Sequence, residues 1–469
     1  MNTKPRYLSL LLGLSAAVAA IAATATEPDP LPERLAIEHV TVLPMSSEAT
    51  ALADMTVLIE DGRIRSITPA SSTRAPSGVR RIDGRGKWLM PGLTDMHAHL
   101  GNVRMLRLFL RMPDLKQSIL RTEDLFTPFL ANGVVRILDM QSMSETIGQR
   151  VEVDAGRMIG PHIVTAAMID GPKPYWPIGA TRVAATPDDG RQAARDAAAE
   201  GYDVIKVYGG LSLETFSAIV DEARRLNLPV VGHLPERGLG RTEEFFQPGF
   251  SLIAHAEEFA QRDAKPALAE IPSYVDMMKK NGAWLTATLS LNERLLEQTA
   301  NPKSLRERPE IRVLHPLMRD MVLEHNPYVA AASPQRIEYL AQIVEFNRQL
   351  VRAFVAAGIP VVAGTDANVP GVVPGYSMHD ELEALTRAGL SNRQALEAAT
   401  RRPCEWLQLS AECGTVEPGK RADLILLDAD PLADIRHSRR ISAVILGGRF
   451  LPRALLDRQI EALAAGAGK

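Results

Sequence analysis

Short apolar segments alternate with longer amphipathic segments through the middle of the chain. The short segments have the length and composition of buried strands, and the longer ones show helical periodicity. We predict eight strands, over residues 89–97, 134–140, 162–167, 203–208, 229–234, 251–256, 283–289 and 360–367. Between them we predict helices, for example over 188–200, 213–226, 274–280 and 379–388. Repeated β-α units of this kind predict an α/β fold, a parallel (β/α)8 TIM barrel.

Two other regions, near the two ends of the chain, have short strands and turns without the alternating helical segments. Residues 37–43, 56–60 and 64–67 are short apolar strands separated by turn signals such as Asp61-Gly62, and similar strands return at 422–427 and 443–446. We therefore expect a small β-sandwich domain built from both chain ends, residues 26–88 and 414–469, and a barrel over 89–413. The interval 290–358 is longer than one helix requires, so we expect it to hold extra helices over the barrel mouth.

The first 25 residues have the three-part layout of a secretory signal peptide. Lys4 and Arg6 precede an uncharged run that ends in Ala23-Thr24-Ala25, where cleavage is expected. The run lacks a charged stop on its far side, so a transmembrane anchor is the weaker interpretation. We therefore expect a periplasmic or secreted protein with no stable membrane anchor after signal removal.

Composition excludes some partners and leaves other questions open. The 469 residues are 46% hydrophobic, and loss of Lys4 and Arg6 with the signal peptide changes the net charge from −3 to −5. No basic patch suggests nucleic acid, so a small-molecule substrate is the expected partner. Homo-oligomerisation is left open. Cys404 and Cys413 could pair in an exported protein, but their spacing alone does not establish a disulfide.

Polar residues fall at the carboxyl ends of the predicted strands, where barrel enzymes carry their active sites. His97 and His99 close the first strand, two residues apart and hence on one side of it. Six titratable residues converge in this way on one end of the barrel, and we call them the rim cluster: His97, His99, Lys206, His233, His255 and Asp366. Imidazole and carboxylate ligands suit Zn²⁺.

Lys206 is the member that a purely structural interpretation explains least well. An ammonium group within a barrel strand has a large desolvation cost unless it is paired. If the amine carries a carboxyl group derived from CO2, the side chain becomes negative and can bridge two metal ions. His162 begins its predicted strand, so we expect it at the opposite, stability face of the barrel.

With these residues, the sequence resembles the metal-dependent amidohydrolase superfamily, in particular its imidazolonepropionase-like and Xaa-Pro dipeptidase-like branch. The resemblance covers nearly the whole mature chain. Its motifs are Pro91 to His99, Lys206-Val207-Tyr208, Gly232-His233, Ala254-His255, Gly364-Thr365-Asp366-Ala367 and Gly414 to Leu424. The resemblance implies that His97, His99 and Asp366 hold one divalent ion, that His233 and His255 hold the other, and that carboxylated Lys206 bridges them.

This resemblance implies a binuclear hydrolase. A metal-bridging hydroxide would attack a carboxamide or peptide-like C–N bond of a small molecule, such as an N-acyl amino acid or an Xaa-Pro-type dipeptide. Asp366 would be the catalytic residue, which takes the proton of the water and passes it to the leaving amine. The two ions are expected to be Zn²⁺.

Substrate contacts are harder to assign than metal ligands. Tyr208 faces the same way as Lys206, and the matching tyrosine of dipeptidase-like relatives contacts the substrate. His379 is either substrate-facing or a helix-start histidine without a chemical role. Tyr175 and Trp176 are candidates for a stiff apolar wall, and Lys173 for a carboxylate contact. Glu257 and Glu258 follow His255 and could orient ligands, but we favour their interpretation as solvated surface carboxylates.

Two other functions are compatible with the same residues. A lactonase or esterase would use the same metal site, because an activated hydroxide does not require an amide. A non-catalytic binding protein on the same barrel would hold no stoichiometric metal.

Overall fold

A computed structural model describes residues 34–46, 51–72, 76–100, 122–176, 179–235, 242–260 and 266–466. The predicted signal peptide, residues 1–25, lies outside these ranges. In the described part of the chain, no helix combines the length and the apolar character needed to cross a bilayer.

Eight parallel strands form the barrel, and each pairs with the next along the chain. They are β6 (Leu93–Ala98), β7 (Val134–Asp139), β8 (His162–Asp170), β10 (Val204–Val207), β11 (Val230–Gly232), β12 (Phe250–Ala254), β13 (Trp284–Thr286) and β14 (Val361–Val362). A parallel bridge between Ala98 and Ala367 joins the first strand to the segment after the last. This arrangement confirms the predicted TIM barrel. The short strand β9 (Arg182–Val183) pairs with β8 outside the ring.

The first predicted strand, 89–97, is two strands. β5 (Trp88–Pro91) pairs antiparallel with β15 of the small sheet, and β6 then enters the barrel. Gly92 lies between them, where an added Cβ would come 2.4 Å from Val135 Cγ2. The chain therefore passes from one sheet to the other at a residue without a side chain, inside the segment that the sequence predicted as one strand.

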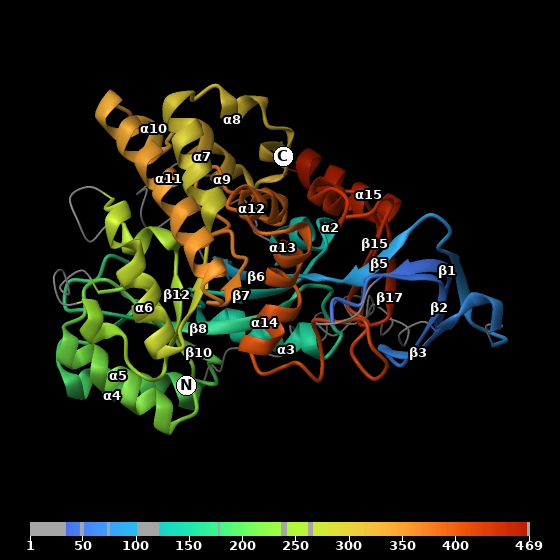
Figure 1. The fold of residues 1–469 in the computed structure, drawn as a ribbon, viewed down its shortest axis with the longest axis horizontal. Helices are drawn as coiled ribbons and strands as arrows, with labels where there is room; N and C mark the ends of the chain where they lie inside the picture. Colours follow the sequence, from blue (N-terminus) through green and yellow to red (C-terminus); the bar gives the residue numbers. More distant parts are fainter. Residues whose placement is uncertain are drawn as a thin grey trace, which may run out of the picture. The chain divides into compact units, whose positions relative to one another are not determined.

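The small sheet is assembled from both ends of the chain, as expected, and lies beside the barrel in Figure 1. Its strands run in the order β17-β16-β15-β5-β1-β2-β3, and β4 pairs with the first half of β1. Besides β5 they are β1 (Leu35–Val42), β2 (Leu52–Glu60), β3 (Arg63–Pro69), β4 (Arg80–Asp83), β15 (Leu424–Leu427), β16 (Ile441–Leu446) and β17 (Arg449–Pro452). Leu35 and Ile37 share one apolar core with Leu424 and Ile445. The division into domains at residues 88 and 414 stays a prediction.

Helices connect the barrel strands, and the four helices predicted above are present. They are α4 (Pro187–Glu200), α5 (Leu213–Arg225), α6 (Ile271–Asn281) and α12 (Tyr376–Arg387). Local sequence explains the bounds of α4: Thr186 and Asp189 form a capping box at its start, and Gly201 ends it with φ 85°. The other connecting and terminal helices are α2 (Thr122–Ala131), α3 (Ser144–Asp154), α13 (Asn392–Ala398), α14 (Arg401–Trp406) and α15 (Arg453–Gly466).

The long interval after β13 holds extra helices, as its length predicted. They are α7 (Leu289–Ala300), α8 (Ser304–Glu307), α9 (Pro316–Leu323), α10 (Pro327–Ala330) and α11 (Pro334–Ala356), and Figure 1 shows them gathered on one side of the barrel. Short 3-10 helices complete the described chain: η1 (Ala70–Ser72), η3 (Thr242–Phe245), η4 (Ala256–Phe259), η5 (Leu268–Glu270), η6 (Pro309–Val313) and η7 (Ile435–Arg439). The extra helices supply much of the wall of the cavity described below.

Candidate active site

All six members of the rim cluster lie at or just beyond the carboxyl ends of barrel strands. His97 and Lys206 are the penultimate residues of β6 and β10, His233 and His255 directly follow β11 and β12, and Asp366 follows β14. Five of the six are buried, with exposed fractions of 8% or less, and His233 is only slightly more exposed. The barrel thus brings together residues that are up to 269 positions apart in the chain, as the strand-end pattern predicted.

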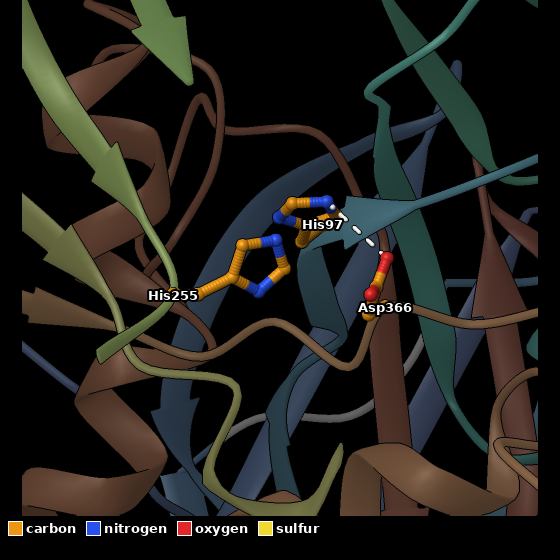
Figure 2. Close-up of side chains that lie close together, drawn as sticks. All are labelled: His97, His255 and Asp366. Carbon is orange, nitrogen blue, oxygen red and sulfur yellow. Dashed lines mark ion pairs between the residues drawn. The ribbon is translucent and has the colours of Figure 1, made fainter. Parts of the chain in front are cut away.

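The polar atoms of the cluster are close enough to share ligands. Asp366 Oδ1 lies 2.8 Å from His99 Nε2 and 3.3 Å from His97 Nε2, and Lys206 Nζ lies 3.4 Å from His97 Nε2. Ligand atoms of His97, His255 and Asp366 all fall within 4.8 Å of one another, and Figure 2 shows these side chains facing a common point. Three such donors are sufficient to hold a metal ion.

The backbone at the strand ends is held in unusual conformations. His255 has φ 73° and Asp366 has φ 60°, values that residues other than glycine rarely adopt. Asp95 ties the segment before Asp366 to β6, because its carboxylate accepts hydrogen bonds from Thr365 N (3.0 Å), Thr365 Oγ1 (2.6 Å) and His97 N (3.1 Å). Gly364 permits this approach, since a Cβ there would lie 2.9 Å from His97 Cβ. These contacts fix the relative positions of His97 and Asp366.

Burial sets the protonation of the cluster. Desolvation lowers the pKa of His97 and His233 well below the usual range and lowers the pKa of His255 to about 3. These three imidazoles are therefore neutral, which is the form that binds metals. Burial raises the pKa of Asp366, but His99, His255 and Lys206 outweigh it and hold that pKa below its usual value. Neutral imidazoles beside an ionised carboxylate fit a divalent cation such as Zn²⁺.

Two histidines are oriented by side chains outside the cluster. His233 Nδ1 lies 2.6 Å from Glu258 Oε1, and His255 Nδ1 lies 2.9 Å from Thr288 Oγ1. Glu258 also accepts a 2.9 Å hydrogen bond from Leu234 N and is 7% exposed. The favoured interpretation of Glu257 and Glu258 as solvated surface carboxylates is therefore wrong. Glu258 orients His233, as the alternative interpretation expected, and Glu257 lines the cavity and accepts a hydrogen bond from Asn292. Contacts of this kind fix the ring orientation of metal-binding histidines.

A cavity of about 620 Å³ opens above the cluster. Tyr175, Trp176 and Tyr208 line it, and the Tyr208 ring lies 4.3 Å from that of His233, between ring centroids. The helices after β13 contribute further lining residues, among them Asn292, Tyr328, Arg336 and Tyr339. The volume is in the range of small-molecule sites. Sequence reasoning did not find these helical residues, because helical periodicity alone does not say which residues face a cavity.

Three residues considered from the sequence lie elsewhere. His379 is buried in α12, where its Nδ1 lies 2.9 Å from Ser438 Oγ of η7, and it is not among the described residues that line the cavity. This placement disagrees with a substrate contact. Lys173 is exposed and also absent from the described lining. His162 contacts Asp154 and Asp423 at the amino end of β8, away from the rim, as expected.

Comparison with known proteins identifies the family. The pattern of the Amidohydrolase family matches residues 88–451. The chain belongs to this family. Membership confirms the resemblance seen in the sequence and identifies the protein as a hydrolase that acts on C–N bonds.

Individual relatives of this amidohydrolase have several activities. The 5-methylthioadenosine/S-adenosylhomocysteine deaminase of Halalkalibacterium halodurans is 24% identical over 87% of this chain and 88% of its own length. Shorter matches cover 15% of the Symbiobacterium thermophilum deaminase of the same name, at 43% identity over 14% of this chain, and 25% of the Rubrobacter xylanophilus imidazolonepropionase, at 38% identity over 22% of this chain. The crystal structure of a "putative prolidase" from Bifidobacterium longum has a TM-score of 0.70 and 25% identity, over 94% of this chain and all of the other.

Proposed function

We propose that this amidohydrolase is a binuclear metal enzyme that hydrolyses a carboxamide or peptide-like C–N bond of a small molecule. The observation that carries the proposal is the convergence of the rim cluster at the strand ends, where all its members except His97 line one cavity. His97, His99 and Asp366 would hold one ion, His233 and His255 the other, and Lys206 would bridge them. Zn²⁺ is the ion that this donor set favours.

Charge and burial support a carboxyl group on Lys206. The side chain is 1% exposed, and no carboxylate of the described residues lies within ion-pair distance of its Nζ. Its neighbours are instead the His97 imidazole, 3.4 Å away, and the Tyr208 ring, and an unpaired buried ammonium is costly. The ammonium group would first lose a proton, and the neutral amine would then form an N–C bond with CO2 and release a second proton. The two losses would turn a buried cation into an anion between two sites for cations.

The protein's own residues supply positioning and proton transfer. When bound, the ions would lower the pKa of a water molecule and polarise the substrate carbonyl oxygen. Asp366 lies in the cavity lining, where its carboxylate can accept a proton from water and pass it to the leaving nitrogen. Oxygen from water then bonds to the carbonyl carbon as the C–N bond breaks, without a covalent enzyme intermediate. Tyr208 would contact the substrate, a role that its position in the cavity lining beside the His233 ring supports.

We propose an N-acyl amino acid or an Xaa-Pro-type dipeptide as the substrate class. The similarity to the Bifidobacterium longum structure supports this class. Aromatic side chains in the cavity, Tyr175 and Trp176, suit an apolar group next to the scissile bond. A lactonase or esterase with the same site is the alternative, because nothing in the rim cluster requires a leaving nitrogen.

We also propose that the protein is periplasmic or secreted. The layout of residues 1–25 supports cleavage and export. The disulfide between Cys404 and Cys413 supports an oxidising compartment, since such bonds are rare in the cytosol.

A hydrolysis screen tests the main proposal. Metal-loaded protein is assayed with N-acyl amino acids, dipeptides and lactones beside Asp366→Asn and a control, Asp276→Asn, which replaces an exposed aspartate of α6. We expect amide hydrolysis by wild type and control, and a loss of about 100-fold or more in Asp366→Asn. Equal activity of wild type and Asp366→Asn would refute the mechanism. Turnover of lactones alone would favour the alternative.

A further inference from the structure

The cavity lining includes a charged side chain outside the rim cluster, on one of the extra helices. Arg336, in the first turn of α11, lines the cavity, as do Lys206 and His325. His325 has an acidic neighbour, since its Nε2 lies 3.5 Å from Asp320 Oδ2. Lys206 belongs to the rim cluster. Apart from tyrosines, two ionisable side chains of the described lining are then left unused by the proposed metal chemistry, Glu257, which accepts a hydrogen bond from Asn292, and Arg336. Arg336 is the cation of the two.

The guanidinium group of Arg336 is held in place without a direct ion pair to a described carboxylate. Its Cζ lies 5.4 Å from the centre of the Tyr339 ring, one turn further along α11, in a cation–π contact. The Arg336 backbone is fixed as well, because Ser333 Oγ caps the helix by accepting a 3.1 Å hydrogen bond from Arg336 N. Among the described residues, no carboxylate lies within ion-pair distance of this guanidinium, including Glu257, which receives a hydrogen bond from Asn292 instead.

An oriented guanidinium group with free donors selects a planar anion. Arginine keeps its charge at any physiological pH and presents paired N–H groups that match a carboxylate. The amino-terminal position in a helix of 23 residues adds a favourable field for an anion. Lys173, which sequence reasoning considered for this role, is exposed and outside the described lining.

We propose that Arg336 binds the free carboxylate of the substrate and so determines specificity. This inference rests on the proposed function: it places the scissile carbonyl at the rim cluster and the carboxylate at α11, with Tyr208 and Trp176 beside the groups between them. It predicts that an amino acid with a free carboxyl group is the leaving group. Compounds in which that carboxylate is a neutral amide are poor substrates.

The test compares matched substrates in matched variants. The substrates are Ala-Pro and Ala-prolinamide, and N-acetyl-phenylalanine and its carboxamide. The variants are Arg336→Met, Arg336→Lys and the control Arg352→Met, which removes an exposed arginine of the same helix outside the described lining. Circular dichroism and metal content establish that each variant is folded and loaded.

We expect Arg336→Met to lower kcat/KM for the carboxylate substrate about 10- to 100-fold, mainly through KM, and to change the amide substrate less than about threefold. Arg336→Lys recovers part of the loss, and Arg352→Met behaves as wild type. An equal fall for both members of a pair, or no fall for either, would overturn the inference.

Calorimetric binding of the same compounds in an Asp366→Asn background separates failure of the inference from failure of the proposed function. If Arg336→Met weakens binding of the compound with the free carboxylate, the inference is supported even if wild type hydrolyses none of the compounds. Binding that is indifferent to Arg336, or equally tight for the amide, contradicts it whether or not hydrolysis occurs.

Discussion

Glu258 Oε1 lies 2.6 Å from Nδ1 of His233, across 25 positions of the sequence. The contact leaves the Nε2 atom of the ring free to face the cavity, where His233 is part of the lining. Glu258 is itself fixed by Leu234 N, so the carboxylate is anchored on both sides. A rigid imidazole whose second nitrogen is held by a carboxylate is a stronger metal ligand than a free one.

Loss of the Glu258 carboxylate should therefore weaken metal binding. We expect Glu258→Gln to lower metal affinity about 10-fold and Glu258→Ala about 100-fold, with the fold retained. Competition with a chromophoric chelator measures the affinity, and elemental analysis measures the content. Glu243→Gln is the control, because Glu243 is exposed and contacts only Lys280 among the partners described for its side chain. Unchanged affinity in both Glu258 variants would show that the contact is structural.

Replacement of Lys206 should change the number of bound ions as well as activity. If a carboxyl group on Lys206 bridges the two ions, Lys206→Met removes an anion from between them, and we expect metal content to fall from about two ions per chain to one or fewer. Protein prepared with ¹³C-bicarbonate should show a carbamate carbon signal by NMR that the variant lacks.

An exposed lysine provides the matched control for that experiment. Lys279→Met, on α6, should keep both the signal and the metal content. Wild-type protein that holds two ions without a carbamate signal would refute the bridging role of Lys206.

Much of the barrel could be predicted because its strands have a simple local signature. Each buried strand is a short apolar run, and the helices between the strands have their own period. The break between β5 and β6 was not predicted in this way, because only Pro91-Gly92 separates two short apolar segments and a single strand over 89–97 accounts for both. Which sheet a strand joins depends on distant partners such as β15.

The rim cluster could be predicted for a related reason: position at a strand end, in a parallel barrel, implies a common location. Arg336 could not, because helical periodicity gives no such rule for the direction of a side chain. Glu258 could be named as a possible ligand-orienting residue, but a 3-10 turn gives no rule that separates this role from a solvated one. His379 shows the opposite error. The loop before it follows Asp366 closely in sequence, yet α12 directs the ring toward Ser438 and not into the cavity.

Asp423 fastens the small sheet to the barrel and should make stability depend on pH. Burial raises its pKa, but His162, Arg421 and the Gly447 N–H outweigh burial and hold the pKa below its usual value. A lowered folded-state pKa contributes stability that is present above the unfolded pKa of about 3.9 and is lost as pH falls through the folded value. We expect Asp423→Asn to lower the free energy of unfolding by about 2–4 kcal/mol near pH 5, because the buried groups that contact Asp423 would no longer face a negative charge.

The difference in the free energy of unfolding between wild type and Asp423→Asn should become smaller as pH falls below about 4. Chemical denaturation at pH 5, 4 and 3 measures this difference in the free energy of unfolding. Asp428→Asn is the control, because Asp428 is an exposed aspartate that pairs with Lys87. A difference that stays constant or widens over this range would contradict the assigned pKa direction.

The disulfide between Cys404 and Cys413 should stabilise the chain only under oxidising conditions. It joins α14 to the loop before Gly414, with a Cα–Cα distance of 5.9 Å, and closes a loop with a sequence separation of nine. A closed loop of this length restricts the unfolded chain and contributes about 2–3 kcal/mol. We expect the double variant Cys404→Ser, Cys413→Ser to unfold at a lower denaturant concentration than oxidised wild type.

Reductant provides the internal control for this prediction. Dithiothreitol should lower the unfolding midpoint of wild type to that of the double variant and leave the variant unchanged, since only wild type has a bond to break. Mass spectrometry of the alkylated, unreduced protein counts the free thiols directly. Two free thiols in protein exported to the periplasm, or a midpoint indifferent to reductant, would refute the bond and remove one support for the proposed location.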